Sequence, residues 1–209
     1  MDAKNLSTSP WRVVSSSITA WVHAHRRASG LLSGVLLGAG FWWPELWPLA
    51  LVGGWWFLWL VCVSPGRSWI FIGWLVGSTK AAIALGWVWS VYPFTGIPHE
   101  LGQWELVVIG WYWLSAAVVI GLSFVPLALL MRVLRRWAAT YRQQLLGSVV
   151  VALGWVGAEL AGAWLFSLFT LGPGSELNAA FSVGFTGYHL AQHPWLLPIA
   201  HGGGVYALS

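Results

Sequence analysis

This chain is a succession of long apolar runs, and the short segments between them hold nearly all of its charged residues. The runs cover residues 31–43, 46–63, 69–91, 106–131 and 146–171. A helix needs about 20 apolar residues to cross the hydrocarbon core of a bilayer, and several runs approach that length. Charged residues make up only 8% of the chain, against about 25% in a soluble domain. The sequence therefore predicts an all-α, polytopic membrane helix bundle.

The charges between the runs predict its orientation, because cytoplasmic loops are enriched in Lys and Arg. All basic residues except Lys80 fall before the first run, between the second and third, or between the fourth and fifth: Lys4, Arg12, Arg26, Arg27, Arg67, Arg132, Arg135, Arg136 and Arg142. The other gaps carry Glu45, Glu100, Glu105 and Glu176. We expect five complete crossings from a cytoplasmic N-terminus, an outer loop over 172–197, and the start of a sixth helix at 198–209.

The first 28 residues form a separate segment ahead of the transmembrane domain, which covers 29–209. Apolar residues and one histidine recur there at spacings of three and four, which is typical of one helix face: Trp11, Val14, Ile18, Trp21, Val22 and His25. We expect an amphipathic helix in the inner interface. Anionic cytoplasmic lipid explains the net charge of +4, so no nucleic-acid partner is expected.

Lys80 and Glu159 are the two ionisable residues near the centres of apolar runs. A lone charge there costs about 2.5 to 3.5 kcal/mol, so such residues are functional candidates. Both lie roughly 16 to 20 Å from the inner ends of their helices, at a rise of ~1.5 Å per residue. We hypothesise that they pair. The alternative is a protonated, hydrogen-bonded Glu159 and a Lys80 that reaches a polar cavity by itself.

The glycines and the tryptophans each have more than one possible role in a membrane helix bundle. The pairs Gly34 with Gly38 and Gly73 with Gly77 are spaced for close helix approach, which we expect inside this chain rather than in a dimer. Most of the 19 tryptophans suit anchoring at the membrane boundary. A few, such as Trp111 and Trp113, are candidates for lining a lipid-binding groove instead.

Other reactive residues form no recognisable catalytic or metal site. His189 and His193 have the spacing of helical metal ligands, but Pro194 ends any helix there, so exposed loop histidines are favoured over metal binding. Cys62 lies in an apolar run and is interpreted as a small hydrophobe. We expect no catalytic residue, metal or cofactor in this chain.

The order of several short phrases resembles the N-terminal membrane region of bacterial apolipoprotein N-acyltransferases. Residues 38–41 and 45–50 resemble the first hairpin of that family, with its proline turn and "W-P-L-A". Residues 73–90 are similar to its third helix with an aromatic exit, and 95–98 to its short outer loop. Residues 152–164 resemble its "A-L-W-x-x-x-E-x-x-R-G-W" phrase, with Gly162 at the position of the Arg. Residues 187–188, 198–200 and 204–206 extend the resemblance to the start of the next helix. The family's "F-P-W" phrase is absent from this sequence.

The resemblance implies a multi-pass protein of the bacterial inner membrane that binds phospholipid and a diacylglyceryl lipoprotein. Family members transfer an acyl chain to the lipoprotein's N-terminal cysteine, using a Glu, Lys and Cys triad in an outer nitrilase-like domain. That domain is absent from this sequence, so we expect an interrupted chain that is inactive alone and depends on such a domain in cis or in trans. The expected lipid- or substrate-facing residues are Trp87, Trp89, Trp164 and Tyr188. The alternative function is a non-enzymatic scaffold or a lipid-binding, transporter-like bundle.

Overall fold

The structure is a computed structural model that describes residues 24–93, 102, 104–137, 140–172, 184–191 and 193–209. This part of the chain is helical and contains no strand. Its elements are α2 (Arg26–Gly38), η2 (Ala39–Phe41), η3 (Pro44–Leu46), α3 (Trp47–Val63), α4 (Ser68–Ala84), η4 (Leu85–Val91), α5 (Trp104–Gly121), α6 (Phe124–Trp137), α7 (Tyr141–Leu171), α8 (Thr186–Ala191), α9 (Leu197–Gly203) and η6 (Val205–Ala207). Most of the predicted interfacial segment, 1–28, lies outside the described residues.

Four of the five predicted runs lie in helical stretches that are long and apolar enough to cross a membrane. These stretches are Pro44–Val63, Ser68–Val91, Trp104–Trp137 and Tyr141–Leu171. The run at 31–43 forms α2 and η2 instead, and α2 has only 13 residues, fewer than the ~20 of a usual crossing. The chain is therefore an all-helical protein with four candidate membrane spans among its described residues, while a fifth crossing and the cytoplasmic N-terminus stay predictions.

A short helix, α9, lies where the start of a sixth helix is predicted. α9 starts at Leu197 and ends at Gly203, because Gly204 follows with a φ of 67° that breaks the helical path. The 3-10 turn η6 then follows. The predicted outer loop contains α8, and its residues 173–183 lie outside the described part.

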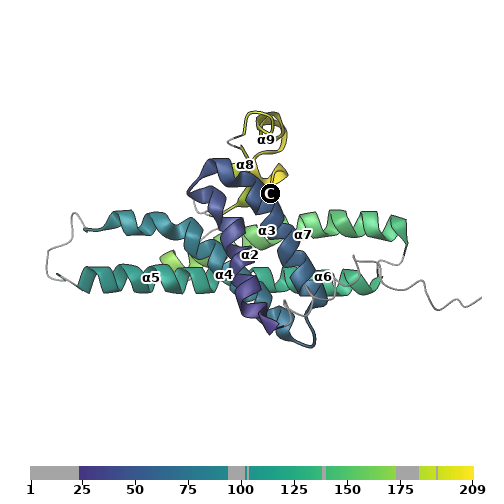
Figure 1. Cartoon of the computed structure of the whole chain (residues 1–209). Helices are drawn as coiled ribbons and strands as arrows, with labels where there is room; N and C mark the ends of the chain where they lie inside the picture. Colours follow the sequence, from purple (N-terminus) through teal and green to yellow (C-terminus); the bar gives the residue numbers. More distant parts are fainter. Residues whose placement is uncertain (1–23, 94–101, 103, 138–139, 173–183, 192) are drawn as a thin grey trace, which may run out of the picture.

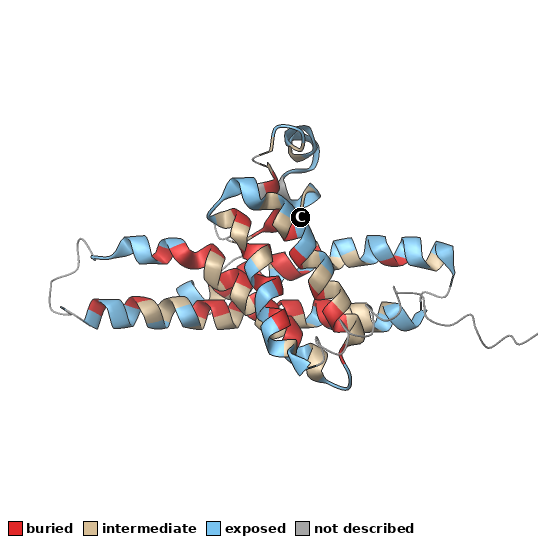
Figure 2. Ribbon diagram, in the orientation of Figure 1, coloured by how far each residue is buried: buried red, intermediate tan, exposed pale blue. Residues whose placement is uncertain are grey.

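The helices form two groups that cross at the centre of the molecule (Figure 1). α2, α3 and α4 pack against one another in alternating directions. α5 extends to one side of this group, while α6 and the first half of α7 extend to the other. Buried residues gather where the two groups cross, and the outlying arms are mostly exposed (Figure 2). The crossing therefore forms the core.

Glycines allow the backbones of this core to approach closely. A Cβ on Gly77 would lie 2.8 Å from the carbonyl oxygen of Gly121, and one on Gly34 would lie 2.5 Å from Cβ of Thr79. Both predicted glycine pairs make such contacts inside the chain, because Gly38 meets Ile83 and Gly73 meets α6. Close packing within one chain, rather than dimerisation, is thus the use that the structure gives them.

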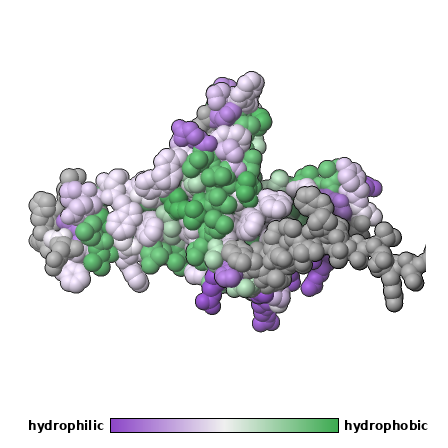
Figure 3. Space-filling model, in the orientation of Figure 1, coloured by the Kyte–Doolittle hydropathy of each residue, from purple (hydrophilic) through white to green (hydrophobic). Residues whose placement is uncertain are grey.

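Arginines from α6 close the end of α3. Arg132 donates a hydrogen bond of 2.7 Å to the carbonyl oxygen of Ser64, and Arg135 donates to that of Cys62. The last carbonyls of a helix have no partner within the helix, and cations interact favourably with them. Hydrophilic side chains lie along the lower edge of the molecule and on its upper lobe, while apolar ones cover its middle (Figure 3). The segments near Arg67 and Arg132, which are predicted to lie on the same side of the membrane, thus contact each other.

Candidate functional site

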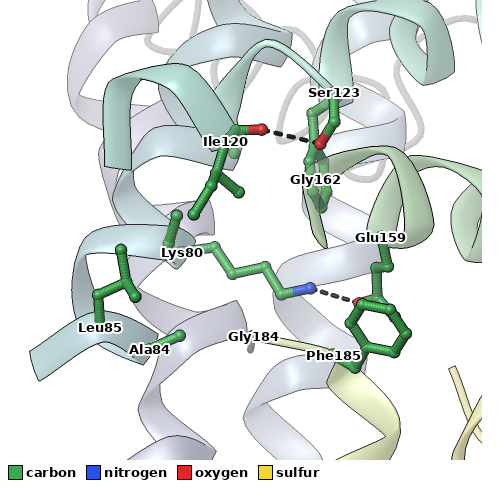
Figure 4. A pocket seen from close by; sticks show the side chains of 12 residues that line it. Lys80, Ala84, Leu85, Ile120, Ser123, Glu159, Gly162, Gly184 and Phe185 are labelled. Atoms are coloured by element: carbon green, nitrogen blue, oxygen red, sulfur yellow. Dashed lines mark hydrogen bonds and ion pairs between the residues drawn. The ribbon is translucent and has the colours of Figure 1, made fainter. Parts of the chain in front are cut away.

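Lys80 and Glu159 form an ion pair in the core. Lys80 comes from α4 and Glu159 from α7, and the ammonium Nζ donates to carboxylate Oε1 (Figure 4). The side chains of Lys80 and Glu159 are 3% and 1% exposed, so the pair is almost completely buried inside the protein. The two residues that the sequence analysis placed at similar depth are therefore in direct contact.

Further donors converge on the same carboxylate oxygen. Trp155, one turn earlier on α7, donates from Nε1 at 3.2 Å. Thr186, at the start of α8, donates from its backbone N–H at 2.8 Å and from its hydroxyl at 2.6 Å. Hydrogen bonds to a charged group are stronger than neutral ones. Glu159 consequently joins α4, α7 and α8 at one point.

Aromatic rings surround the ammonium group of Lys80. Nζ lies 5.2 Å from the ring centroid of Phe124 and 5.7 Å from that of Trp155. Both separations are within the ~6 Å range of cation–π attraction, which gains strength when the cation is desolvated. The rings also contact each other, with centroids 5.5 Å apart. The core thus stabilises the buried cation with ring faces as well as a carboxylate.

A small cavity of about 20 Å³ adjoins the pair, between Lys80, Glu159, Ser123 and Gly184 (Figure 4). A cavity needs roughly 10 to 15 Å³ of such volume to hold one water molecule. Among the described residues, no donor reaches the second carboxylate oxygen of Glu159, Oε2, although that atom is buried. The cavity therefore has room for about one water molecule.

Gly162 packs closely against Ser123 and Ile120, so a side chain at this position would require these neighbours to move by a few tenths of an ångström. A Cβ there would lie 3.1 Å from Oγ of Ser123 and 3.2 Å from a methyl carbon of Ile120. Lys80 approaches Glu159 from α4, so the basic partner of the glutamate comes from another helix.

Trp87 and Trp89 line two separate apolar hollows beside η4. Trp87 is 51% exposed and, with Val91, Val108 and Tyr112, borders a hollow of about 290 Å³. Trp89 is 42% exposed and borders a second hollow of about 410 Å³. The other main walls of the second hollow are Val35, Trp42, Trp43, Ile83 and Trp113.

The other aromatic candidates are more scattered. Trp113 lines the second hollow and donates from Nε1 to the carbonyl oxygen of Ala82 at 2.8 Å, whereas Trp111 is exposed and borders neither hollow. Trp164 is exposed on α7. Tyr188 is exposed on α8, and its ring contacts Phe185. The structure therefore brings Trp87 and Trp89 to one element, while Trp164 and Tyr188 lie on others.

The remaining histidine and cysteine residues form no cluster in the described part of the chain. No group of three His, Cys, Asp or Glu residues there is arranged to hold a metal ion. His193 packs against Trp47, with ring centroids 5.1 Å apart, and the side chain of His189 lies outside the described part. Cys62 is half-buried at the end of α3.

Sequence reasoning missed Thr186 and the role of Trp155 at this site. Thr186 is separated from Glu159 by the segment 160–185, and a lone threonine in a predicted loop carries no distinguishing signal. Trp155 does precede Glu159 by four residues, the spacing that places side chains on one helix face. That spacing was the available signal for an indole donor.

Comparison with known proteins returns no match: no family model, no curated protein and no solved structure is similar to this chain.

Proposed function

We propose that this chain is a multi-pass membrane protein that binds phospholipid between its helices. The observation that carries the proposal is the pair of apolar hollows beside η4, lined by Trp87 and Trp89. Their volumes lie near or within the ~300 to 1,000 Å³ range of small-molecule sites. Acyl chains are the apolar ligand that a membrane supplies in excess, and ring faces offer them rigid contact area.

The buried ion pair holds in place the end of α4, from which η4 and its two tryptophans continue. The cavity next to Lys80 reaches Ala84 and Leu85, the residues that join α4 to η4. Lys80 therefore fixes the end of α4 to Glu159, and η4 continues directly from that fixed point. In this proposal the pair is a positioning device for Trp87 and Trp89 and takes no part in chemistry.

The finer proposal is that the bundle serves as the membrane domain of an apolipoprotein N-acyltransferase-like system in the bacterial inner membrane. It rests on the order of the family-like phrases, including the one that contains Glu159. The chain would present phospholipid and a diacylglyceryl lipoprotein to a nitrilase-like domain, in cis or on a separate chain. That domain would supply the cysteine nucleophile, which needs an acid/base partner.

Photo-crosslinking tests the lipid-binding proposal. Membranes that contain the protein would be supplied with a phosphatidylethanolamine whose acyl chain carries a photoactivatable group, and the cross-linked residues would be mapped by mass spectrometry. We expect labelling around η4 that falls in Trp87→Ala and Trp89→Ala. Trp104→Ala is the matched control, because Trp104 is exposed but borders neither hollow. Equal labelling in all three variants would refute the site.

A thiol-capture assay separates the acyltransferase system from a non-enzymatic scaffold. The protein would be incubated in native membranes with a phospholipid that carries an alkyne-tagged acyl chain. A thioester on the cysteine of an associated nitrilase-like domain supports the enzyme system, and we expect no thioester on Cys62. Absence of any protein thioester would favour the scaffold or transporter-like alternative.

A further inference from the structure

A larger groove lies away from η4, between α3, α6 and α7. Its volume is about 560 Å³. Apolar side chains from all three helices form most of its walls: Leu58, Met131, Leu134, Val151 and Trp155. Polar side chains lie around it as well: Arg135, Gln144 and Ser148, which are exposed. Ser209, whose hydroxyl oxygen accepts from the backbone N–H of Gly187, also borders the groove. The groove is therefore amphiphilic, with a long apolar interior and a cationic, hydrogen-bonding rim.

Gly147 keeps the α7 side of the groove open. A Cβ built on this glycine would have no atom within 4 Å, so a larger side chain would project into unoccupied space. A Cβ on Gly157, further along α7, would also have no atom within 4 Å, but Gly157 is exposed, whereas Gly147 is buried, and it does not border the groove. The two glycines thus provide a substitution that fills the groove and a matched one that does not.

The rim carries positive charge that suits an anion. Arg135 donates to the carbonyl oxygen of Cys62, and a guanidinium group has five N–H donors in all. Arg132 is held next to it on the carbonyl oxygen of Ser64. Arg136 and Arg142 are exposed nearby in sequence, at the end of α6 and the start of α7. Basic pockets between membrane helices are typical sites for anionic lipid head groups.

From this combination we infer that the groove binds one anionic phospholipid, with an acyl chain against Leu58 and Val151 and its phosphate at Arg135. An apolar chain joined to an anion matches both parts of the groove, whereas a purely apolar ligand would leave the guanidinium group unused. The site is distinct from the proposed lipid site at η4. α3 and α4 are antiparallel neighbours, the groove lies at the C-terminal end of α3, and η4 follows the C-terminal end of α4, so the two sites lie at opposite ends.

Native mass spectrometry of the full chain, delipidated in detergent, tests this inference. The probes are dioleoyl phosphatidylglycerol and dioleoyl phosphatidylcholine. We expect one tightly bound phosphatidylglycerol and weaker binding of phosphatidylcholine. Gly147→Phe should abolish the tight site, while Gly157→Phe should keep it. Arg135→Gln should weaken phosphatidylglycerol binding roughly tenfold, the effect of losing one charge-assisted hydrogen bond, while Arg136→Gln should change it little.

Three results would overturn the inference. The two lipids could bind equally to the parent protein, which would indicate annular lipid only. The two glycine variants could lose lipid alike, or Arg136→Gln could weaken binding as much as Arg135→Gln. If Gly147→Phe fails to fold, Ala152→Leu on the same wall of the groove replaces it, because Ala152 is exposed. Photo-crosslinking at η4 should persist in these variants, so failure of one site is distinguishable from failure of the other.

Discussion

At the scale of single residues, the main feature of the molecule is the pairing of two buried charges, Lys80 and Glu159. Either Lys80 or Glu159 alone would be costly inside a membrane span. Together they neutralise each other, and Oε1 of Glu159 also accepts from Trp155 and twice from Thr186. A buried pair of this kind seldom adds net stability over apolar residues, but loss of one partner leaves the other charge uncompensated.

Removal of either charge should therefore be worse than removal of both. We expect Lys80→Met and Glu159→Gln each to destabilise the protein by about 3 to 5 kcal/mol. The double variant should recover much of this loss, because the glutamine oxygen still accepts from Thr186 and no charge stays unpaired. Thermal unfolding of the detergent-solubilised protein measures the effect. A double variant whose loss of stability equals the sum of the two single losses would show that the pair contributes no coupling.

Thr186 offers a finer test of the same site. Thr186→Val removes the hydroxyl donor at 2.6 Å but keeps the backbone N–H donor. Because a hydrogen bond to a charged group contributes about 1.5 to 3 kcal/mol, α8 should open more readily. Hydrogen exchange at residues 187–190 should accelerate, and Thr186→Ser, which retains a hydroxyl, should behave like the parent. Unchanged exchange in the valine variant would mean that other contacts hold α8.

At the scale of helices, glycines set how closely the elements pack. α4 contacts α5 through Gly77 and Gly121, where backbone approaches backbone. Without a strong hydrophobic force between helices inside a bilayer, such close van der Waals contact is a main source of association. The same argument applies to Gly34 and Gly38 of α2, which face α4.

Gly121→Ala should separate α4 from α5. The added Cβ would lie 2.0 Å from Oγ of Ser78 and 2.6 Å from its backbone nitrogen, so the helix must shift. We expect a loss of about 1 to 3 kcal/mol, as for other overpacked sites. Gly157→Ala is the control, because its Cβ would meet no atom within 4 Å and alanine favours a helix over glycine by about 1 kcal/mol. Equal thermal midpoints for the two variants would contradict this account.

At the scale of the whole molecule, segments assigned to the same side of the membrane meet one another. Trp47, next to the predicted first outer turn, packs on His193 in the predicted outer loop, so predicted outer segments are in contact. At the other end, Arg132 reaches the carbonyl oxygen of Ser64, which joins two predicted inner segments. The contacts support two distinct ends and leave the direction of insertion to experiment.

Cysteine labelling in intact cells would determine that direction. In a Cys62→Ser background, single cysteines would replace Glu45 or Ser90 at the predicted outer end and Ser68 or Arg136 at the predicted inner end. A membrane-impermeant maleimide should label the first two without lysis and the last two only after lysis, because Lys and Arg favour the cytoplasmic side. The opposite pattern would reverse the orientation, and a mixed pattern would change the number of crossings.

The sequence alone determined the helical class, the approximate limits of the four long runs, and the similar depths of Lys80 and Glu159. These follow from properties of a single segment: the length of an apolar run, the exclusion of charge from it, and the rise per helical residue. The short first run was harder to assign, since the same pattern suits either a crossing or a packed helix such as α2.

Only the tertiary structure decided which surfaces meet. It brought Thr186 to Glu159, Gly121 to Gly77 and the arginines of α6 to the end of α3, pairs that are far apart in sequence. It also formed the hollows beside η4 and the groove beside Gly147. Such contacts depend on how helices cross, and the spacing of residues within one helix does not specify the crossing, because small residues and exposed arginines are compatible with many neighbours.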